Sequence, residues 1–419
     1  MVDVLVIGAT GFCGRHAARY VLEHPERSKY TVGLAARSRS KIASIGLPID
    51  DSVQIFELDI LDKQAVEAVV KQAKVVLNCI GPFWHYGTPI VHACARNGVH
   101  YVDITGETPW IFDIINKFDY LATQTHAIII PSCAVDSIPA DAGVYLASQT
   151  LGHAPLGAST TASRMGGGAP GGTIATFIAT AEDVPRPLLA RSTRDWALSP
   201  VPGADSPPLR LVYSLGSRRG AVAPFGAINR ALVQRTAGLL ELARLERKRT
   251  TEEPPPGYGP AFTYTEFMQT GGAISAFLVS VTIAAAVVGI TFITPFRWLV
   301  KRFATQPGSG PADDTLERGG LTFVNITASD EPSPRYAKSV IKGHGDPGTL
   351  LTAAMVGESA IALLLDELPP LAKGGGVLTP MTALGDNIIR RMKACDRFEI
   401  TSGIVDGPDG DIEESRKTR

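Results

Sequence analysis

Short apolar runs alternate with amphipathic segments through the first third of the chain. The first run, Val4–Ile7, is continuously apolar, as a parallel strand buried on both faces requires. The residues that follow, Cys13–Val21, carry apolar side chains at helical spacing. The alternation continues and predicts an α/β fold, a doubly wound parallel sheet with helices on both faces. The expected strands are Val4–Ile7, Thr31–Ala35, Gln54–Glu57, Val75–Cys79, Tyr101–Asp103 and Ala127–Pro131.

Three glycines lie three residues apart between the first predicted strand and the first predicted helix, in VLVIGATGFCGRH. Gly8 permits a tight turn, Gly11 lets the backbone approach a pyrophosphate, and Gly14 lets the helix pack closely on the strand. Free N–H groups at the start of the helix, where Cys13 lies, would face the phosphates. The spacing differs from the commoner G-x-G-x-x-G, but its place between strand and helix predicts a dinucleotide site. The alternative is a glycine-rich turn without a ligand.

The ends of the second and third strands indicate which dinucleotide binds. No Asp or Glu follows the second strand to accept hydrogen bonds from a ribose 2′-hydroxyl. Arg37, Ser38 and Lys41 follow it instead, and these groups suit a 2′-phosphate, so NADPH is favoured over NADH. Solvated charges without a ligand are the alternative. Asp59 ends the third strand, where a carboxylate beside the adenine is expected, and Asp62 is expected to cap a helix.

The fourth strand ends where the nicotinamide half of the cofactor would lie. Cys79 ends this strand, and Gly81 and Pro82 then force a turn. The aromatic residues 83–86 follow and are expected on a loop, where they either pack under a second domain or form the wall of a substrate pocket. His92 and Cys94 have no further ligands at useful spacing, so we expect no metal site.

The amino-acid composition of the chain changes from about Ala140. Segments rich in glycine and proline predict exposed loops of a second, substrate-facing domain, in which 171–173 open a helix that points into the cleft. We expect residues 1–139 to bind the cofactor and 140–345 to face the substrate. Residues 346–419 should form helices that pack back on the first domain, followed by a disordered tail from Asp406. Further expected elements are strands at 321–329 and Tyr336–Ile341 and helices at Thr349–Leu365 and Thr379–Lys393.

One apolar segment, 271–300, needs separate treatment. No charged residue occurs between Thr270 and Arg297, so the segment is long enough to span a bilayer. A single span would place the cofactor domain and the C-terminal residues on opposite sides of the membrane. We therefore expect a peripheral or partly buried apolar element, with a transmembrane helix as the alternative.

Composition narrows the function further. The 419 residues have a formal net charge of −1 with the charges mixed along the chain, which argues against a nucleic-acid partner. The five cysteines are scattered without a C-x-x-C pair, and no secretory signal precedes the first strand. We expect a cytoplasmic protein, located in the cytosol or at the surface of membranes or lipid droplets.

Several motifs together resemble the saccharopine dehydrogenase-like oxidoreductases, and among them the trans-acting enoyl reductases of lipid-type polyketide biosynthesis. The motifs are GATGFCGRHAARY, GPFWHYGTPIVHACARNGVHYVDITGE, DSIPAD, GGTIAT, FTYTE and GVLTPMTALGD. The resemblance implies a Rossmann-type domain, a second α+β domain and reduction by a nicotinamide cofactor. Some members associate with lipid droplets, which suits the apolar segment. The cofactor contacts that the resemblance implies are Gly8, Thr10, Gly11, Phe12, Gly14, Arg37, Ser38, Asp59 and Gly81.

The leading hypothesis is an NADPH-dependent reductase of a hydrophobic, unsaturated or carbonyl-bearing substrate, which is free or bound to a carrier. The partners to test are a synthase, a membrane surface and a second copy of the chain in a homodimer. Tyr86 and Tyr264 are the candidate proton donors, because both match family motifs and carry a phenol. A saccharopine-like imine reductase is the first alternative, with Arg164 and Arg186 as candidates to hold a dicarboxylate. A non-catalytic NADP-binding protein of membranes or lipid droplets is the second.

Overall fold

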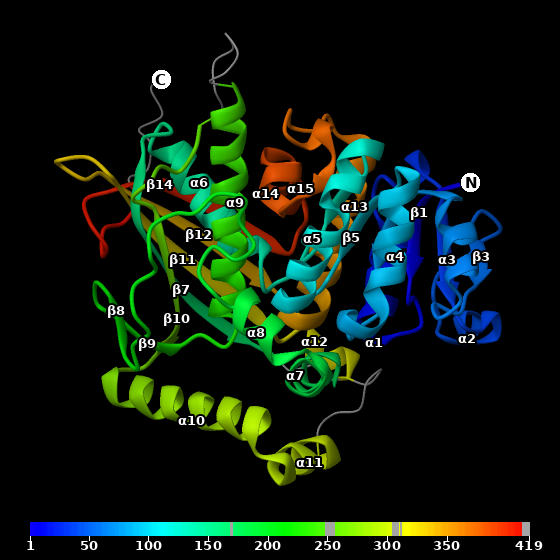
Figure 1. Ribbon diagram of the computed structural model, residues 1–419, viewed down its shortest axis with the longest axis horizontal. Coiled ribbons are helices and arrows are strands. Elements are labelled where there is room, and N and C mark those ends of the chain that lie inside the picture. Colours follow the sequence, from blue (N-terminus) through cyan, green and yellow to red (C-terminus); the bar gives the residue numbers. More distant parts are fainter. Residues whose placement is uncertain (168–170, 248–255, 304–309, 311, 413–419) are drawn as a thin grey trace.

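The computed structural model describes residues 1–419 except 168–170, 248–255, 304–309, 311 and 413–419. Within these residues the chain forms two seven-stranded sheets with helices packed around them (Figure 1). The first sheet comes mostly from the N-terminal third, and the second comes from the middle and the end of the chain. The α/β architecture predicted from the hydrophobic pattern is confirmed.

All neighbouring strands of the first sheet are parallel. Their order is β13-β6-β5-β4-β1-β2-β3, so the direction of winding reverses between β1 and β4. In doubly wound sheets this reversal opens a crevice at the carboxyl ends of the strands, where ligands bind. The strands are β1 (Val2–Ile7), β2 (Val32–Ala36), β3 (Gln54–Glu57), β4 (Ala73–Asn78), β5 (His100–Asp103), β6 (Ile128–Ile130) and β13 (Gly376–Val377).

The side chains of β1 alternate between two buried layers, as a strand covered on both faces requires. Val4 and Val6 pack in the cluster that contains α1 (Phe12–Glu23) and α13 (Thr352–Leu365). Leu5 and Ile7 pack on the other face, in the cluster that contains α3 (Lys63–Val70), α4 (Phe83–Asn97) and α5 (Thr108–Thr125).

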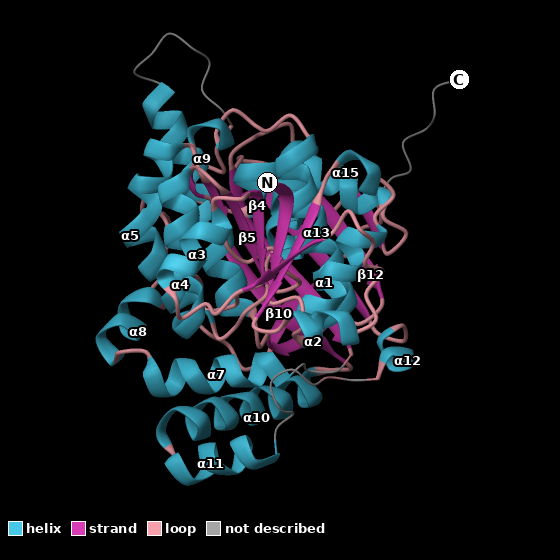
Figure 2. Cartoon of the chain, turned by 90° about the vertical axis from the view of Figure 1, so that its right-hand side faces the viewer, coloured by secondary structure: helices cyan, strands magenta, loops and turns pink. Residues whose placement is uncertain are grey.

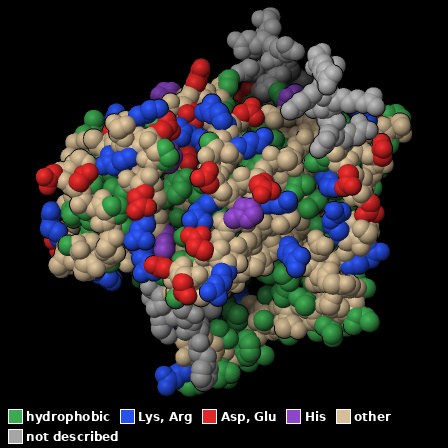
Figure 3. Space-filling view, turned by 180° about the vertical axis from the view of Figure 1, so that it is seen from behind, with side chains coloured by type: hydrophobic (Ala, Val, Ile, Leu, Met, Phe, Trp, Pro, Cys, Tyr) green, Lys and Arg blue, Asp and Glu red, His purple; other side chains and the backbone are tan. Residues whose placement is uncertain are grey.

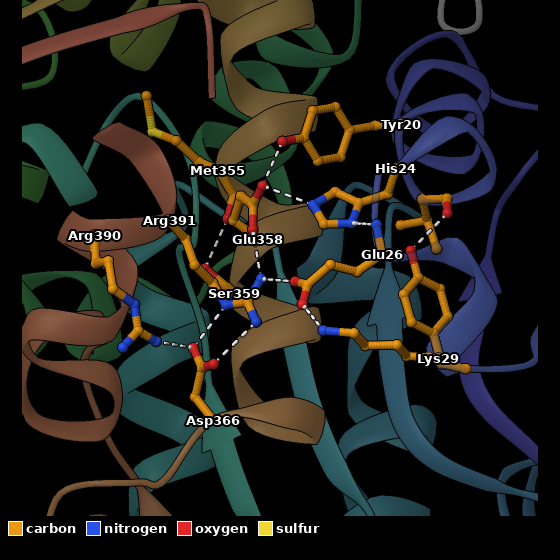
Figure 4. A network of polar contacts seen from close by, with 12 residues as sticks. Tyr20, His24, Glu26, Lys29, Met355, Glu358, Ser359, Asp366, Arg390 and Arg391 are labelled. Atoms are coloured by element: carbon orange, nitrogen blue, oxygen red, sulfur yellow. Dashed lines mark hydrogen bonds and ion pairs between the residues drawn. The ribbon is translucent and has the colours of Figure 1, made fainter. Parts of the chain in front are cut away.

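Helix α1 is held from the far end of the chain by a buried polar network (Figure 4). Glu358 of α13 accepts a hydrogen bond from Tyr20 Oη at 2.6 Å and contacts His24 Nε2 at 3.0 Å. Arg391 of α15 (Asp386–Ala394) pairs with Glu358 at 3.3 Å, with Asp366 at 2.6 Å and with Glu26, just after α1, at 2.8 Å. The helix that follows the glycine turn is therefore fixed by residues near the C-terminus.

The second sheet has the order β14-β12-β11-β7-β10-β9-β8 and is mixed: β7 and β10 run parallel, and the other neighbours are antiparallel. Helix α6 (Ile138–Thr150) packs on β11 and β12, and α9 (Gly226–Arg247) packs on β10. The strands are β7 (Leu156–Gly166), β8 (Tyr213–Leu215), β9 (Arg218–Val222), β10 (Thr263–Thr270), β11 (Gly320–Ser329), β12 (Tyr336–His344) and β14 (Phe398–Val405).

A layer of helices lies beneath the two sheets (Figure 2). It contains α7 (Gly171–Asp183), α10 (Ala273–Phe292) and α11 (Thr294–Phe303), with α8 (Arg186–Ser192) beside α7. Glu182 of α7 pairs with Arg297 at 3.0 Å and with Lys301 at 2.6 Å, both on α11. A side chain at Gly289 of α10 would meet the Phe296 ring at 2.6 Å, so α10 and α11 pack closely. These contacts join the three helices into one unit.

Two helices of the described chain are long and apolar enough to cross a membrane. Pro347–Leu365 is mostly buried and belongs to the core of the first sheet, whereas only 17% of Ala273–Phe292 is buried. The outer side of α10 and α11 exposes large apolar side chains, which gather at the lower edge of Figure 3. We call this surface the α10–α11 apolar face; it consists of Ile274, Phe277, Leu278, Val281, Val288, Phe292, Ile293, Trp298 and Leu299.

Three local expectations need correction. The aromatic residues 83–86 do not form a loop but the first turn of α4, because Glu107 caps the start of that helix. The helix expected over Thr379–Lys393 divides at Gly385, whose φ of 52° ends α14 (Pro380–Leu384) before α15 begins. The tail expected to be disordered is ordered as far as residue 412. Lys338 Nζ holds it by donating to the Gly410 carbonyl at 2.8 Å. Residues 413–419 lie outside the described part.

Candidate functional site

A cavity of about 1220 Å³ opens at the carboxyl ends of the strands of the first sheet. One side is lined by the residues that directly follow β1 to β6. The other side is lined by α7, α8, the start of α9 and α10. Most of the predicted site residues meet here: Gly8, Thr10, Gly11, Phe12, Cys13, Arg37, Lys41, Asp59, Cys79, Gly81, Pro82 and Tyr86.

The glycine turn has the shape that a dinucleotide needs. Gly8 has a φ of +85°, and a side chain there would meet Ile80 Cγ1 at 2.6 Å. A side chain at Gly14 would overlap the Gly8 carbonyl, so Gly14 does not line the cavity but allows α1 to lie against the strand. Gly11 is the N-cap of α1 and supplies no side-chain hydrogen bond. The first N–H groups of α1 are thus left for a phosphate, and the turn fits a pyrophosphate.

The adenosine end of the cavity carries the two expected cations. Arg37 follows β2 directly, and Lys41 lies in the first turn of α2 (Arg39–Ser44); both side chains are exposed and line the cavity. Ser38 does not line it, because its Oγ caps α2 by accepting from Lys41 N at 3.3 Å. Asp59 lies beyond β3, is exposed, and accepts from Leu61 N at 3.0 Å. Arg37 and Lys41 fit the 2′-phosphate of NADP(H).

The structure corrects the place expected of Tyr264. This side chain is only 1% exposed, lies in the core and does not line the cavity. Its phenol donates to Glu266 Oε2 at 2.9 Å, and Asn229 donates to the same oxygen at 2.7 Å. Tyr264 therefore stabilises the region behind the cavity and is not positioned to meet a substrate there. Tyr86, by contrast, does line the cavity.

The loops after β5 and β6 are fixed to each other by Asp103. Its Oδ1 accepts from Thr105 N at 2.9 Å and from Ser132 N at 2.8 Å, and its Oδ2 accepts from Tyr101 Oη at 2.7 Å. Ser132 also donates to the Thr105 carbonyl at 2.6 Å. Burial raises the pKa of Asp103 to about 7. This cluster positions the residues that follow both strands at the cavity.

Two carboxyl side chains on these loops were missed by the sequence analysis as site residues. Glu107 accepts from Phe83 N and Trp84 N, each at 2.7 Å, and from Thr176 Oγ1 at 3.3 Å, so it caps α4 and contacts α7. Burial raises the pKa of Glu107, and the two backbone N–H groups oppose that shift. Asp136 follows β6 and also lines the cavity. The place of Asp136 after a predicted strand could have indicated a site residue, but its motif, DSIPAD, has the pattern of a helix start.

The second half of the cavity is apolar. Phe177 of α7 and Phe225, just before α9, stack with ring centroids 6.3 Å apart. Met165, Ile228 and Ile290 add aliphatic side chains from β7, α9 and α10. Among the residues that the structure describes, no group of three or more His, Cys, Asp or Glu side chains forms a metal site.

Comparisons with known proteins agree with this site. Residues 4–127 match the saccharopine dehydrogenase NADP binding domain. A Mycobacterium tuberculosis protein with the provisional name of trans-acting enoyl reductase is 31% identical, over 94% of this chain and 95% of its own. A trans-acting enoyl reductase of Mycobacterium bovis is 30% identical, over 93% of this chain and 95% of its own.

The fold has a counterpart among solved structures. Apo saccharopine dehydrogenase (L-Glu forming) from Saccharomyces cerevisiae matches 97% of this chain and 100% of its own, with a TM-score of 0.51 and 12% identity. At that identity the likeness concerns the fold alone. The two relatives and the matching NADP-binding domain, together with the glycine turn, assign the chain: it belongs to the saccharopine dehydrogenase-like oxidoreductases, as a relative of their trans-acting enoyl reductases, and is an NADP-dependent oxidoreductase.

Proposed function

We propose that this protein uses NADPH to reduce the C=C bond of an enoyl group in a hydrophobic chain of lipid or polyketide type, presented by a carrier protein or a synthase partner. The observation that carries the proposal is one cavity with two unlike halves: a dinucleotide turn on one side and an apolar wall on the other. The names of the relatives agree with this chemistry.

The cofactor half favours NADPH over NADH. A 2′-phosphate would pair with Arg37 and Lys41, whereas the residues after β2 offer no carboxylate for a ribose 2′-hydroxyl. Bound at this turn, NADPH supplies a hydride to the substrate carbon. The chain must then stabilise the negative charge that develops on the substrate oxygen. Tyr86 lines the cavity and carries a phenol, so we assign it a hydrogen bond to that oxygen.

The apolar half favours a long hydrocarbon chain as substrate. The whole cavity of about 1220 Å³ is larger than the roughly 300–1000 Å³ of a pocket for one drug-sized ligand, as a site shared by a cofactor and a substrate requires. The stacked rings of Phe177 and Phe225 and the side chains of Ile228 and Ile290 present apolar surface where the nicotinamide half of the cofactor would end. Burial of such a chain would be favourable by the hydrophobic effect.

The α10–α11 apolar face supports a peripheral attachment to a membrane surface. Helix α10 contributes Ile290 and the half-exposed Val287 to the cavity, while Leu278 and Phe292 on the same helix are exposed. Trp298 is 64% exposed, and Lys301 and Arg302 of α11 follow it, which is the pattern of an interfacial helix. In this proposal α10 connects the membrane surface to the substrate half of the cavity. The protein would remain on the cytoplasmic side.

Two alternative functions, imine reduction and non-catalytic NADP binding, can be distinguished from enoyl reduction by experiment. Imine reduction of the saccharopine kind requires cations for a dicarboxylate, but Arg164 is exposed on β7 and does not line the cavity. Arg186 lies outside the cavity as well, where it contacts the Phe292 ring at 5.2 Å. A non-catalytic NADP-binding protein of membranes or lipid droplets is the other alternative.

The test is to incubate the purified protein with NADPH and a panel of enoyl, keto and imine substrates, each free and carrier-bound. Loss of NADPH absorbance and the mass of the product identify the bond that is reduced. We expect turnover of long-chain enoyl substrates, faster with NADPH than with NADH. Turnover of a small polar imine alone would establish the saccharopine-like alternative, and an absence of turnover with tight NADPH binding would establish the non-catalytic one.

A further inference from the structure

Asp136 lies in the half of the cavity that the cofactor's adenosine does not use. In the sheet order β6-β5-β4-β1-β2-β3, the 2′-phosphate cations follow β2 and the pyrophosphate turn follows β1. The nicotinamide half therefore extends toward β4, and the ends of β5 and β6 lie beyond it. Asp136 follows β6 and lines the cavity there. It is thus placed on the side where a substrate would meet the cofactor.

Three described side chains with a carboxyl group line the cavity, and they differ in their partners. Asp59 lies at the adenosine end. Glu107 is occupied by two backbone N–H groups and Thr176. Asp136 is different: its Oδ1 is closed off from water and has no hydrogen-bond partner among the described residues. A buried carboxyl oxygen without a partner is costly and calls for an explanation, and the Asp136 side chain lines the cavity, where a ligand can supply one.

Because Gly106 has no side chain, the Asp136 carboxyl has room beside it. A side chain at Gly106 would meet Asp136 Oδ2 at 2.6 Å, and Ile228 lies on the other side of the same gap. Gly106 belongs to the loop that Asp103 ties to the loop after β6. The chain therefore holds the Asp136 carboxyl in a fitted position, next to apolar surface.

The carboxyl of Asp136 holds its proton to a much higher pH than an ordinary aspartate does, and about half of the molecules still carry it at pH 7. Burial raises its pKa from the ordinary value of 3.8 to about 7, and its own backbone N–H opposes the shift. The titratable side chains on the surrounding elements are Asp103 and Glu107 near β5, Tyr86 of α4 and Asp141 of α6. Asp103, Glu107 and Asp141 each accept hydrogen bonds from described residues.

We propose that Asp136 is the general acid of the reduction, which gives its proton to the substrate carbon next to the carbonyl. This inference rests on the proposed function. The carbon β to the carbonyl accepts the hydride from NADPH, and the C=C bond becomes a single bond. The α carbon takes the proton of Asp136, so that the products are the saturated chain, NADP⁺ and the Asp136 carboxylate. Water then returns a proton to the carboxylate.

The main test compares Asp136→Asn with the parent protein. Asn keeps the shape and removes the proton, so kcat should fall by about 100- to 10 000-fold, the usual contribution of a general acid. The affinity for NADPH and the KM should change less than about threefold. Asp183→Asn is the matched control. Asp183 is exposed, does not line the cavity, and its carboxyl pairs with His85 at 3.0 Å. The kcat of this variant should stay at the parent value.

The pH profile separates a general acid from a structural residue. The parent kcat should decrease as the pH rises through about 7, because the carboxyl must be protonated. Asp103 and Asp141 also have pKa values raised by burial to about 7. The decrease is therefore assigned to Asp136 only if the residual activity of Asp136→Asn lacks it. An unchanged profile in the variant would refute the assignment.

Thermal unfolding gives a readout that needs no cofactor or substrate. Between pH 4 and 7 the folded protein keeps the Asp136 proton and the unfolded chain does not, so stability decreases as the pH rises. Asp136→Asn lacks this loss, and its Tm should exceed that of the parent by an amount that grows up to pH 7. A lower Tm in the variant at pH 7 would contradict a neutral carboxyl.

The outcomes distinguish the inference from the proposed function. If the parent protein reduces enoyl substrates and Asp136→Asn retains its kcat, the inference fails and the function stands. If the parent protein reduces only imine or keto substrates and the variant loses kcat, the proposed function fails, and Asp136 is the general acid toward the substrate nitrogen or oxygen instead of a carbon. A parent protein without turnover of any substrate would refute both.

Discussion

The two halves of the cavity are built by different means. The cofactor half consists mainly of backbone: Gly8 to Cys13 follow one another in a single turn, and the start of α1 presents its N–H groups. The substrate half consists of side chains from separate helices, such as Phe177 of α7, Ile228 of α9 and Ile290 of α10. A backbone site tolerates almost no added atom, whereas a wall of apolar side chains changes its shape with each substitution. The cofactor should thus be fixed and the substrate adjustable.

The largest effect should come from Gly14→Ala in the cofactor half. The added methyl would overlap the Gly8 carbonyl, which is backbone and cannot rotate away. Helix α1 must then move off the strand, at a cost of about 1–3 kcal/mol of folding free energy or more, and NADPH binding should become undetectable by calorimetry. Gly166→Ala is the control, because nothing lies within 4 Å of a side chain at that position. Normal NADPH binding by Gly14→Ala would show that close helix packing is not required.

A smaller effect should follow from Arg37→Ala, which removes one charged partner and leaves the turn intact. Loss of a hydrogen bond to a charged group costs about 1.5–3 kcal/mol, so the affinity for NADPH should fall roughly 10- to 150-fold, while that for NADH should not change. Arg39→Ala is the control, since Arg39 donates to the Ile55 carbonyl at 2.8 Å and does not line the cavity. Equal affinities of the parent protein for NADPH and NADH, measured by titration calorimetry, would overturn the assignment.

The smallest effect on the cofactor should come from the α10–α11 apolar face. Leu278 is 59% exposed, and Leu278→Asp places a charge where we propose contact with a membrane. Burial of a leucine side chain contributes about 1.5–3 kcal/mol, so binding to phospholipid vesicles in a flotation assay should weaken roughly 10- to 150-fold. NADPH affinity should be unaffected.

The control for this variant is Tyr120→Asp. Tyr120 is 78% exposed on α5 and lies outside the apolar face. Vesicle binding that both variants retain would remove the membrane from the proposal. A change from dimer to monomer in Leu278→Asp would instead indicate that a second copy of the chain covers this face.

The parts of the molecule that are local in sequence could be predicted, and the parts that depend on distant contacts could not. Strands β1 to β6 were located to within two residues, because most of them are short apolar runs covered on both faces; the edge strand β3, which has no buried residue, is the exception. In the second sheet, β7 to β10 gave no such signal, since one face is polar or the strands are short. The break at Gly385 was missed because both α14 and α15 have helical spacing, and only the positive φ separates them.

The same distinction between local sequence and distant contacts applies to the residues of the site. Gly8, Arg37 and Asp59 could be read from their places after strands, and the structure puts them in the cavity. Tyr264 matched a family motif, but a motif does not tell which face of a strand is buried. Asp136 was passed over because a carboxylate before a Ser-Ile-Pro sequence is typical of a helix start. The feature that separates it from the other two carboxyl groups of the cavity, a buried oxygen without a hydrogen-bond partner among the described residues, exists only in the folded protein.

The network around Arg391 has a consequence for how the protein is made. Arg391 binds Glu26 across 365 residues of chain, and Glu358 binds Tyr20 and His24 of the helix that begins the phosphate site. Domains at the N-terminus usually fold first during synthesis. Here the partners of α1 are among the last residues to leave the ribosome. The contacts that hold the C-terminal end of α1 are therefore complete only when the chain has been translated nearly to its end.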